Sequence, residues 1–285
     1  MASPRTSGPG VTGPDRNVTE TVRLDAAGSA DRVVVSAALE MAVRAAHAAG
    51  SLLQQRVGPS LDIVADAAHD IKLAVDREAD DAIAAVLRTG PPWPVLSEER
   101  GFNGSAGRYT DVEWCWVVDP LDGTVNFART IPIWSISIAL CRHGEPVLGV
   151  VHVPAQHESF TGIVGSGAWR NGDAMRVSDV DRTSNAILCT GVPVAADFSD
   201  AALVSFAERI RSFKKVRLLG SAAISLAYVA AGRADAYYER DIRVWDVAAG
   251  VALVRAAGGT ATMTPMTDHD RMAVFAGNGR INAIS

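Results

Sequence analysis

One short stretch constrains this chain more than any other, an apolar run that ends in two acids on a turn-forming sequence. The run Trp116-Val117-Val118 has the composition of a buried strand end, and Asp119-Pro120-Leu121-Asp122-Gly123-Thr124 follows it. Proline and glycine mark a turn, so the sequence predicts two carboxylates held at the edge of a core. Two fixed acids and a main-chain carbonyl are oxygen ligands of the kind that Mg²⁺ prefers. A structural Asp-Pro turn is the alternative that this stretch alone leaves open.

Two further acidic segments flank this turn in the sequence. Upstream, Glu98 and Glu99 follow the apolar Pro94-Val95-Leu96, although paired glutamates also mark solvated faces. Downstream, Asp246 lies near the start of a helix-like segment that runs to Gly258-Gly259, where an acidic helix cap is the ordinary alternative. Each segment is unspecific alone, and the three together favour a shared metal site.

The three segments, in this order, resemble the inositol monophosphatase family of Mg²⁺-dependent, lithium-sensitive phosphatases. The resemblance covers most of the chain, from about residue 35 to about residue 279. Its two signature motifs are residues 119–124 and the segment 245–259. Two smaller segments agree with it, the hairpin-like 167–172 and the loop-like 220–223.

The resemblance implies an α+β fold, a layered αβαβα sandwich of the inositol monophosphatase / fructose-1,6-bisphosphatase type. The residue pattern is consistent with such a mixture. Apolar residues recur at helical spacing from Val33 to Arg56 and again from Asp76 to Leu87. Residues 134–140 alternate as a strand does, and residues 147–153 return as its partner. The C-terminal part repeats the mixture between residues 201 and 257.

We expect three parts along the chain. Residues 1–31 are rich in Gly, Pro, Ser and Thr without apolar periodicity, which is typical of a flexible N-terminal extension. Residues 32–182 form an N-terminal α+β half that carries most of the metal ligands. Residues 183–285 form a C-terminal α/β half that carries the substrate loop and Asp246.

The resemblance implies a cofactor of two or three Mg²⁺ ions per site. In this implied arrangement Asp119 bridges two of the ions. Glu98 and the Leu121 carbonyl complete the first ion's ligands, and Asp122 with Asp246 completes the second's. Sites with two metals stabilise both the attacking and the leaving oxygen of an in-line displacement.

The implied catalytic residues are Glu98, Thr124 and Asp76. Thr124 together with Glu98 orients the water that the metal activates. Asp76 corresponds to an aspartate at a helix start that supports a third, weaker metal, and a plain helix cap is the alternative for it. Glu99 corresponds to a residue that supports Glu98 from outside the metal's own ligands.

The implied substrate contacts come from the turn, from a second loop and from two acids. They are Asp122, Gly123, Thr124, Gly220, Ser221, Ala222, Glu239 and Asp246. Glu239 precedes Asp246 by the spacing seen in members that prefer inositol phosphates. A buried acceptor for a substrate hydroxyl discriminates strongly against analogues that lack the hydroxyl. A surface glutamate at a strand end is the alternative reading of Glu239.

The chain departs from the family pattern ahead of Asp76. Lys72 and Leu73 stand where the family usually carries Val-Thr, in a segment that forms a mobile loop over the site in the family. Closure of that loop and affinity for the third metal are therefore open for this chain.

Composition excludes several classes of protein. The net charge is −5 and no long run of Lys or Arg is present, so we expect no nucleic-acid partner. Three cysteines without zinc-type spacing favour reduced core residues of a cytoplasmic protein. No stretch of about 18 consecutive apolar residues is present, so we expect no membrane partner. By resemblance the protein is a homodimer.

The leading prediction is an enzyme, a Mg²⁺-dependent phosphomonoesterase acting on myo-inositol 1-phosphate or a closely related polyol or sugar phosphate. The alternatives within the family hydrolyse fructose 1,6-bisphosphate, histidinol phosphate or 3′-phosphoadenosine 5′-phosphate. An alternative of another class is a non-enzymatic binding partner of the transcription machinery.

Overall fold

The computed structural model describes residues 29–58, 63–67, 70–105, 107–192, 199–266, 268 and 270–281. Most of the expected extension, residues 1–28, lies outside the described residues. The first described helix begins at Ser29 and therefore includes the last three residues, 29–31, of the extension expected from composition.

The helices and strands follow the order that the residue pattern predicts. The α-helices are α1 (Ser29–Arg56), α2 (Ala74–Leu87), α3 (Thr124–Ala128), α4 (Asp200–Ser212), α5 (Ala222–Ala230) and α6 (Val244–Ala256). The first ten strands are β1 (Ile63–Ala67), β2 (Asp70–Leu73), β3 (Val95–Ser97), β4 (Gly101–Phe102), β5 (Trp114–Asp122), β6 (Ser135–Arg142), β7 (Glu145–Val153), β8 (Glu158–Ile163), β9 (Gly167–Arg170) and β10 (Asp173–Met175). The others are β11 (Ile187–Thr190), β12 (Lys215–Leu218), β13 (Ala236–Arg243), β14 (Thr260–Pro265) and β15 (Arg271–Gly277).

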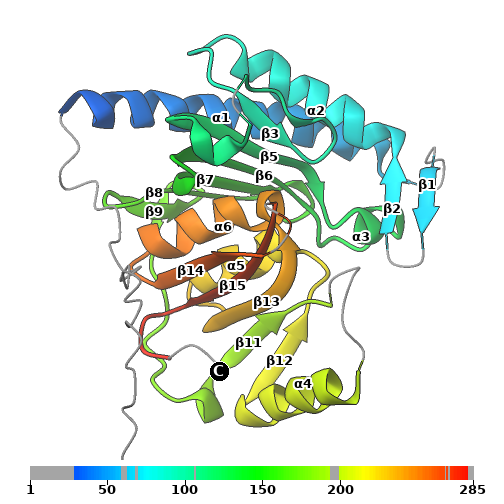
Figure 1. Cartoon of the computed structure of the whole chain (residues 1–285), viewed down its shortest axis with the longest axis vertical. Helices are drawn as coiled ribbons and strands as arrows, with labels where there is room; N and C mark the ends of the chain where they lie inside the picture. The colour runs from blue at the N-terminus through cyan, green and yellow to red at the C-terminus, as the bar shows by residue number, and fades with distance from the viewer. Residues whose placement is uncertain are drawn as a thin grey trace, which may run out of the picture.

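These elements form the expected layers of an α+β sandwich (Figure 1). The larger sheet has the order β10-β9-β8-β7-β6-β5-β3-β4, and the smaller sheet has the order β12-β11-β13-β15-β14. Helices α1 and α2 cover one face of the larger sheet, and α5 and α6 lie between the two sheets. Strands β1 and β2 pair with each other as a separate hairpin.

The central strand β5 shows how the sequence divides its side chains between layers. Successive residues of a strand point to opposite faces. Trp116 and Val118 accordingly pack in the cluster formed with α1 and α2, whereas Cys115 and Val117 pack in the cluster formed with α5 and α6. All four side chains are buried. Asp119 lies on the same face of the strand as Cys115 and Val117, so its side chain points toward α6 rather than toward α1.

Helix α1 bears on the expectation that no segment of the chain binds a membrane. Its segment Arg32–Arg56 is long and apolar enough, by length and composition, to cross a membrane. The apolar face of the helix is used inside the protein, however. Ala42, Ala45 and Leu53 are completely buried in the cluster that α1 forms with α2 and the larger sheet. Packing against the core is therefore a sufficient reason for the apolar composition of this helix.

Deleting residues 1–28 is expected to leave the stability of the remaining protein within about 1 kcal/mol of the full chain. The reason is compositional, because a segment with so few apolar residues has little to contribute to a core. Thermal unfolding of the full and shortened chains checks this, with phosphate release as a second measurement. A fall of more than about 10 °C in the melting temperature would show that the segment docks on the protein.

Two histidines meet where α1 packs on β7 and β8. The rings of His47 and His152 are stacked with centroids 4.3 Å apart and an interplanar angle of 18°. The Ser159 Oγ lies 2.8 Å from His152 Nδ1 and 3.3 Å from His47 Nε2. Burial, assisted by the neighbouring His47, lowers the pKa of His152 to about 4.

His152 is expected to make the folded state less stable in mild acid. Its pKa lies below the value of about 6.5 in an unfolded chain, so the unfolded state binds the proton first as the pH falls. Stability is thus lost between about pH 6.5 and about pH 4. At pH 5 an unscreened imidazole would lower the free energy of unfolding by about 2 kcal/mol. Solvent screens the partly exposed ring, so the expected loss is about 1 kcal/mol.

Urea unfolding of matched variants checks this expectation. The stability difference between wild type and His152→Asn should shrink by about 1 kcal/mol between pH 7.5 and pH 5. The control is His157→Asn at an exposed histidine with φ of 54°, a conformation that asparagine tolerates. A difference for His152→Asn that stays constant with pH would contradict the assignment.

Candidate metal centre and substrate pocket

A β-bulge in β5 brings the two acids of the central motif onto one face of the sheet. Asp119 and Asp122 are three residues apart, so a regular strand would point them to opposite faces. Asp119 pairs with Ser137 of β6, however, and Asp122 pairs with Ser135, only two residues away. One extra residue on β5 therefore restores the same orientation for both acids. The sequence predicted a turn directly after Val118, but β5 continues to Asp122.

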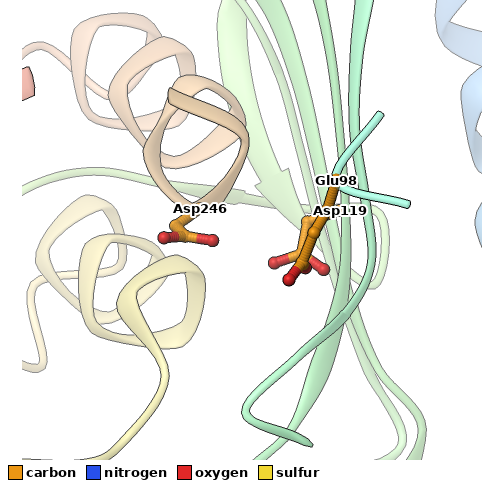
Figure 2. A group of neighbouring side chains, drawn as sticks. All are labelled: Glu98, Asp119 and Asp246. Atoms are coloured by element: carbon orange, nitrogen blue, oxygen red, sulfur yellow. The ribbon is translucent and has the colours of Figure 1, made fainter. Parts of the chain in front are cut away.

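Two other elements deliver acids to the same place. Glu98 follows the last residue of β3, which runs parallel to β5, and its backbone N–H donates to the Val118 carbonyl at 3.2 Å. Asp246 lies in the first turn of α6. Carboxylate oxygens of Glu98, Asp119 and Asp246 all lie within 4.8 Å of one another. Figure 2 shows Asp246 at the beginning of its helix, facing the neighbouring pair Glu98 and Asp119.

The carboxylates of this cluster lie close enough to raise one another's pKa values. Burial, followed by the charges of Glu98, Asp122 and Asp246, raises the pKa of Asp119 well above its usual value. Burial and the charges of Glu98 and Asp122 likewise raise the pKa of Asp246. The basic residues among the described pocket lining are Arg243 and Arg271, which form ion pairs with Asp268 and Asp241.

The donor set fits a hard metal cation. Its donors are carboxylate oxygens, without the sulfur or imidazole ligands that zinc and copper sites use. Buried like charges repel and are costly to desolvate, and a bound cation removes both costs. The cluster can therefore hold a metal ion of the kind that takes oxygen ligands.

Asp122 is held by the loop 220–223, which was expected to contact the substrate. Its Oδ2 accepts hydrogen bonds from Ser221 Oγ, from the Ala223 backbone N–H at 2.9 Å and from Ser135 Oγ at 3.4 Å. Burial raises the pKa of Asp122 to about 6, against the lowering effect of these hydrogen bonds. The carboxylate thus attaches β5 to the first turn of α5.

The segment after Asp122 requires glycine. Gly123 has φ of 90°, and a Cβ there would lie 2.9 Å from the Ile133 carbonyl oxygen. Thr124 begins the short helix α3, and its hydroxyl donates to the Leu121 carbonyl at 3.0 Å. Asn126 of the same helix donates through Nδ2 to the Leu219 carbonyl at 2.9 Å, which ties α3 to the second loop.

The acids line a cavity of about 700 Å³ that also contains most of the other predicted site residues. Those that line it are Glu98, Asp119, Leu121, Asp122, Gly123, Thr124, Gly220, Ser221, Ala222, Glu239 and Asp246. Asp76 is not among the described residues that line it. This residue lies in the first turn of α2 and its Oδ2 accepts the Leu73 backbone N–H at 2.8 Å, an arrangement typical of a helix cap. Glu99 is also directed elsewhere, 3.6 Å from the Nε of Arg77 on α2.

Glu239 is buried in the wall of this cavity rather than placed on the surface. Glu239 is only 5% exposed, and its Oε2 accepts a hydrogen bond from the Tyr237 hydroxyl at 2.8 Å. Burial raises the pKa of Glu239 to about 7, partly opposed by the Tyr237 hydrogen bond. Gly191 leaves room for this carboxylate, because a Cβ at residue 191 would lie 2.3 Å from Oε2.

Sequence reasoning missed Asn126 and Gly191 as parts of the site. Asn126 lies within the central motif region, so its position beside Thr124 was a usable signal. Gly191 carries no local signal, because its importance comes from Glu239 on a different strand.

Comparisons with known proteins agree with this geometry. The model of the inositol monophosphatase family matches residues 35–282. An inositol-1-monophosphatase of Mesorhizobium japonicum is 39% identical over 228 residues, which is 79% of this chain and 84% of the relative. A Nus factor SuhB of Pseudomonas aeruginosa is also 39% identical over 228 residues, with 78% of this chain and 83% of the relative covered. The crystal structure of the extragenic suppressor protein SuhB of Bartonella henselae superimposes with a TM-score of 0.76 at 34% identity, covering 86% of this chain and 95% of that one.

These matches show that the chain belongs to the inositol monophosphatase family. Its fold is that of the solved members, and the activity that its family supports is that of a metal-dependent phosphatase acting on a phosphate ester.

Proposed function

We propose that this protein is a Mg²⁺-dependent phosphomonoesterase that hydrolyses myo-inositol 1-phosphate or a closely related polyol or sugar phosphate. The observation that carries the proposal is the position of buried Glu239 in the same cavity as the cluster of Glu98, Asp119 and Asp246. One wall of the cavity suits a cation and a phosphate, and another wall suits a hydroxyl group.

The metal ligands are proposed to divide between two ions. Glu98, Asp119 and the Leu121 carbonyl would hold the first ion, and Asp119, Asp122 and Asp246 would hold the second. Bound Mg²⁺ supplies positive charge that stabilises the attacking and leaving oxygens of the phosphoryl transfer and acidifies a water molecule. Ser221 and Ala223 donate to Oδ2 of Asp122, so the other carboxylate oxygen of Asp122 is the one proposed to bind the second ion.

Thr124 and Glu98 are proposed to orient the attacking water by accepting hydrogen bonds from it. The Thr124 hydroxyl is already fixed, because it donates its own hydrogen to the Leu121 carbonyl and so presents its lone pairs outward. The backbone N–H groups of Gly123 and Thr124 are proposed to donate to the phosphate oxygens. Fixed donors of this kind stabilise charge that develops in the transition state without reorganising.

Specificity is proposed to depend on Glu239 and on the backbone of Gly220, Ser221 and Ala222. Glu239 receives one hydrogen bond from Tyr237, which leaves its second oxygen to accept from a substrate hydroxyl. A substrate without a hydroxyl there would leave a buried acceptor unpaired, which is costly. Asp76 is proposed to act from outside the cavity lining, by supporting a third ion.

A screen of phosphate release over a panel of esters tests this proposal. The panel contains myo-inositol 1-phosphate, a second polyol phosphate, fructose 1,6-bisphosphate, histidinol phosphate and 3′-phosphoadenosine 5′-phosphate. The highest kcat/KM is expected for inositol 1-phosphate or the polyol phosphate, with Mg²⁺ required and Li⁺ inhibitory. A clear preference for the nucleotide or for histidinol phosphate would overturn the substrate assignment.

A second role, as a binding partner of the transcription machinery, is favoured by relatives that carry the name Nus factor SuhB. Such a contact does not need turnover. Asp119→Asn protein used as bait in a pull-down should therefore retain transcription proteins if this role exists. Absence of those proteins with both wild-type and variant bait would remove the second role.

Location and assembly are also proposed here. All three cysteines are buried and unpaired, which supports a cytoplasmic protein. We propose a homodimer whose subunits each divide near residue 182 into the two halves expected from the sequence.

A further inference from the structure

The turn that carries Glu98 needs support beyond its strands. Glu98, Glu99 and Arg100 connect β3 with β4, which are only three and two residues long. The backbone bond from Glu98 to Val118 places Glu98 beside Asp119. Holding the residues on either side of Glu98 therefore narrows the backbone conformations open to so short a connection.

Asp80 of α2 holds both flanks of this turn. Its Oδ1 accepts a hydrogen bond from the Ser97 hydroxyl at 2.5 Å, and its Oδ2 accepts one from the Arg100 Nε. The residue is only 2% exposed although it is charged. Ser97 also accepts the backbone N–H of Glu99 at 3.2 Å, so its hydroxyl connects Asp80 to the turn's own backbone. A buried carboxylate is thus attached immediately before and immediately after the Glu98-Glu99 pair.

We propose that Asp80 is a positioning residue for the metal site, acting through Ser97 and Arg100 to fix the turn that presents Glu98. The inference rests on the proposed function, because it takes Glu98 to be a metal ligand. Groups that orient metal ligands from outside typically change metal affinity 10- to 100-fold when they are removed. Helix α2 is a rigid support for such a contact, since Ala79 and Ile83 on it are buried in the core.

Binding of Mn²⁺ alone, used as a probe in place of Mg²⁺, tests the proposal without any turnover. Titration calorimetry or the electron paramagnetic resonance signal of free Mn²⁺ gives the affinity. Asp80→Asn keeps the size of the side chain but turns an NH₂ or a weaker acceptor toward Arg100. We expect its Mn²⁺ affinity to fall at least 10-fold, and Asp80→Glu to recover part of the loss.

The matched control is Glu78→Gln, on the same helix and in an ion pair with Arg56 at 2.8 Å, away from the turn. Its Mn²⁺ affinity should stay within twofold of wild type. Activity gives a second readout, because a positioning defect should raise the Mg²⁺ concentration needed for half-maximal rate more than it lowers kcat at saturating Mg²⁺. A general structural defect would lower kcat without this shift.

Ser97→Ala is the second variant if Asp80→Asn does not fold, and its Mn²⁺ affinity should fall at least threefold. Wild-type Mn²⁺ affinity in a folded Asp80→Asn or Ser97→Ala protein would overturn the inference and leave the proposed function intact. Failure of the wild-type protein itself to bind Mn²⁺ would overturn both.

Discussion

Asp119→Asn is expected to reduce Mg²⁺-dependent phosphate release by about 10³-fold while leaving the fold intact. Loss of one preorganised electrostatic group commonly costs 10²- to 10³-fold, and Asp119 is proposed to contact both ions. The Asn side chain keeps an oxygen for the Leu121 backbone N–H, which donates to Asp119 at 2.9 Å. The local hydrogen bond therefore survives although the charge is lost.

The same substitution should make the metal-free protein at least as stable as wild type. Asp119 is 1% exposed, and burial together with neighbouring carboxylates raises its pKa, so its charge is unfavourable without a cation. Mg²⁺ should raise the melting temperature of wild type through binding to the folded state, and this increase should vanish in Asp119→Asn.

Thermal melts and phosphate release with and without Mg²⁺ measure both effects. The control is Asp173→Asn, at an exposed aspartate of β10, which should behave as wild type in both assays. Near-normal turnover by folded Asp119→Asn protein would remove Asp119 from the metal centre and would leave the proposed mechanism without its central ligand.

The order of helices and strands was predictable because it depends on local residue patterns. The expected partner strand 147–153 corresponds to β7, Glu145–Val153, and the helical spacing from Asp76 to Leu87 corresponds to α2, Ala74–Leu87. Both elements begin two residues before the expected start, because caps and pairing partners decide where an element begins. The acids at residues 98 and 246 had a local signal, since Glu98 follows the end of β3 and Asp246 lies in the first turn of α6. Asp119 had one in the Pro- and Gly-containing motif that follows it.

The bulge in β5 was not predictable from the same information. Pro120 and Gly123 indicate a turn, and a turn was the prediction for this segment. Pairing of Asp122 with Ser135 instead extends the strand, and this pairing depends on β6 rather than on local preference. The orientation of Asp122 toward the cavity is therefore a property of the sheet.

The contact of Asp80 with the turn that carries Glu98 was also not predictable, because it joins residues that are far apart in the sequence. Asp80 and Arg100 are twenty residues apart on a helix and a turn, and charged residues such as these are usually on the surface. Asp76, by contrast, carried a recognisable position at a helix start. The structure gives it the hydrogen bond of a helix cap, so its metal role stays a prediction.

Glu239→Gln is expected to lower kcat/KM for myo-inositol 1-phosphate by 10- to 100-fold, about 1–3 kcal/mol of lost transition-state interaction. The physical reason is that the carboxylate is buried in the cavity proposed to bind the substrate and has one oxygen committed to Tyr237. Glutamine keeps an acceptor for Tyr237 but places an NH₂ group where a substrate hydroxyl would donate. Ethyl phosphate has no ring hydroxyl, so its hydrolysis should change less than threefold.

Two further variants separate a specific effect from a general one. Glu208→Gln, at an exposed glutamate of α4, should leave both substrates unaffected. Gly191→Ala should reproduce the selective loss, because its Cβ would lie 2.3 Å from Oε2 and so must displace the Glu239 carboxylate. Steady-state kinetics on the two substrates measure the contrast. Equal losses on both esters would mean that Glu239 supports the fold of the cavity instead of reading a hydroxyl, and the preference for a polyol phosphate over a nucleotide or histidinol phosphate would lose its main support.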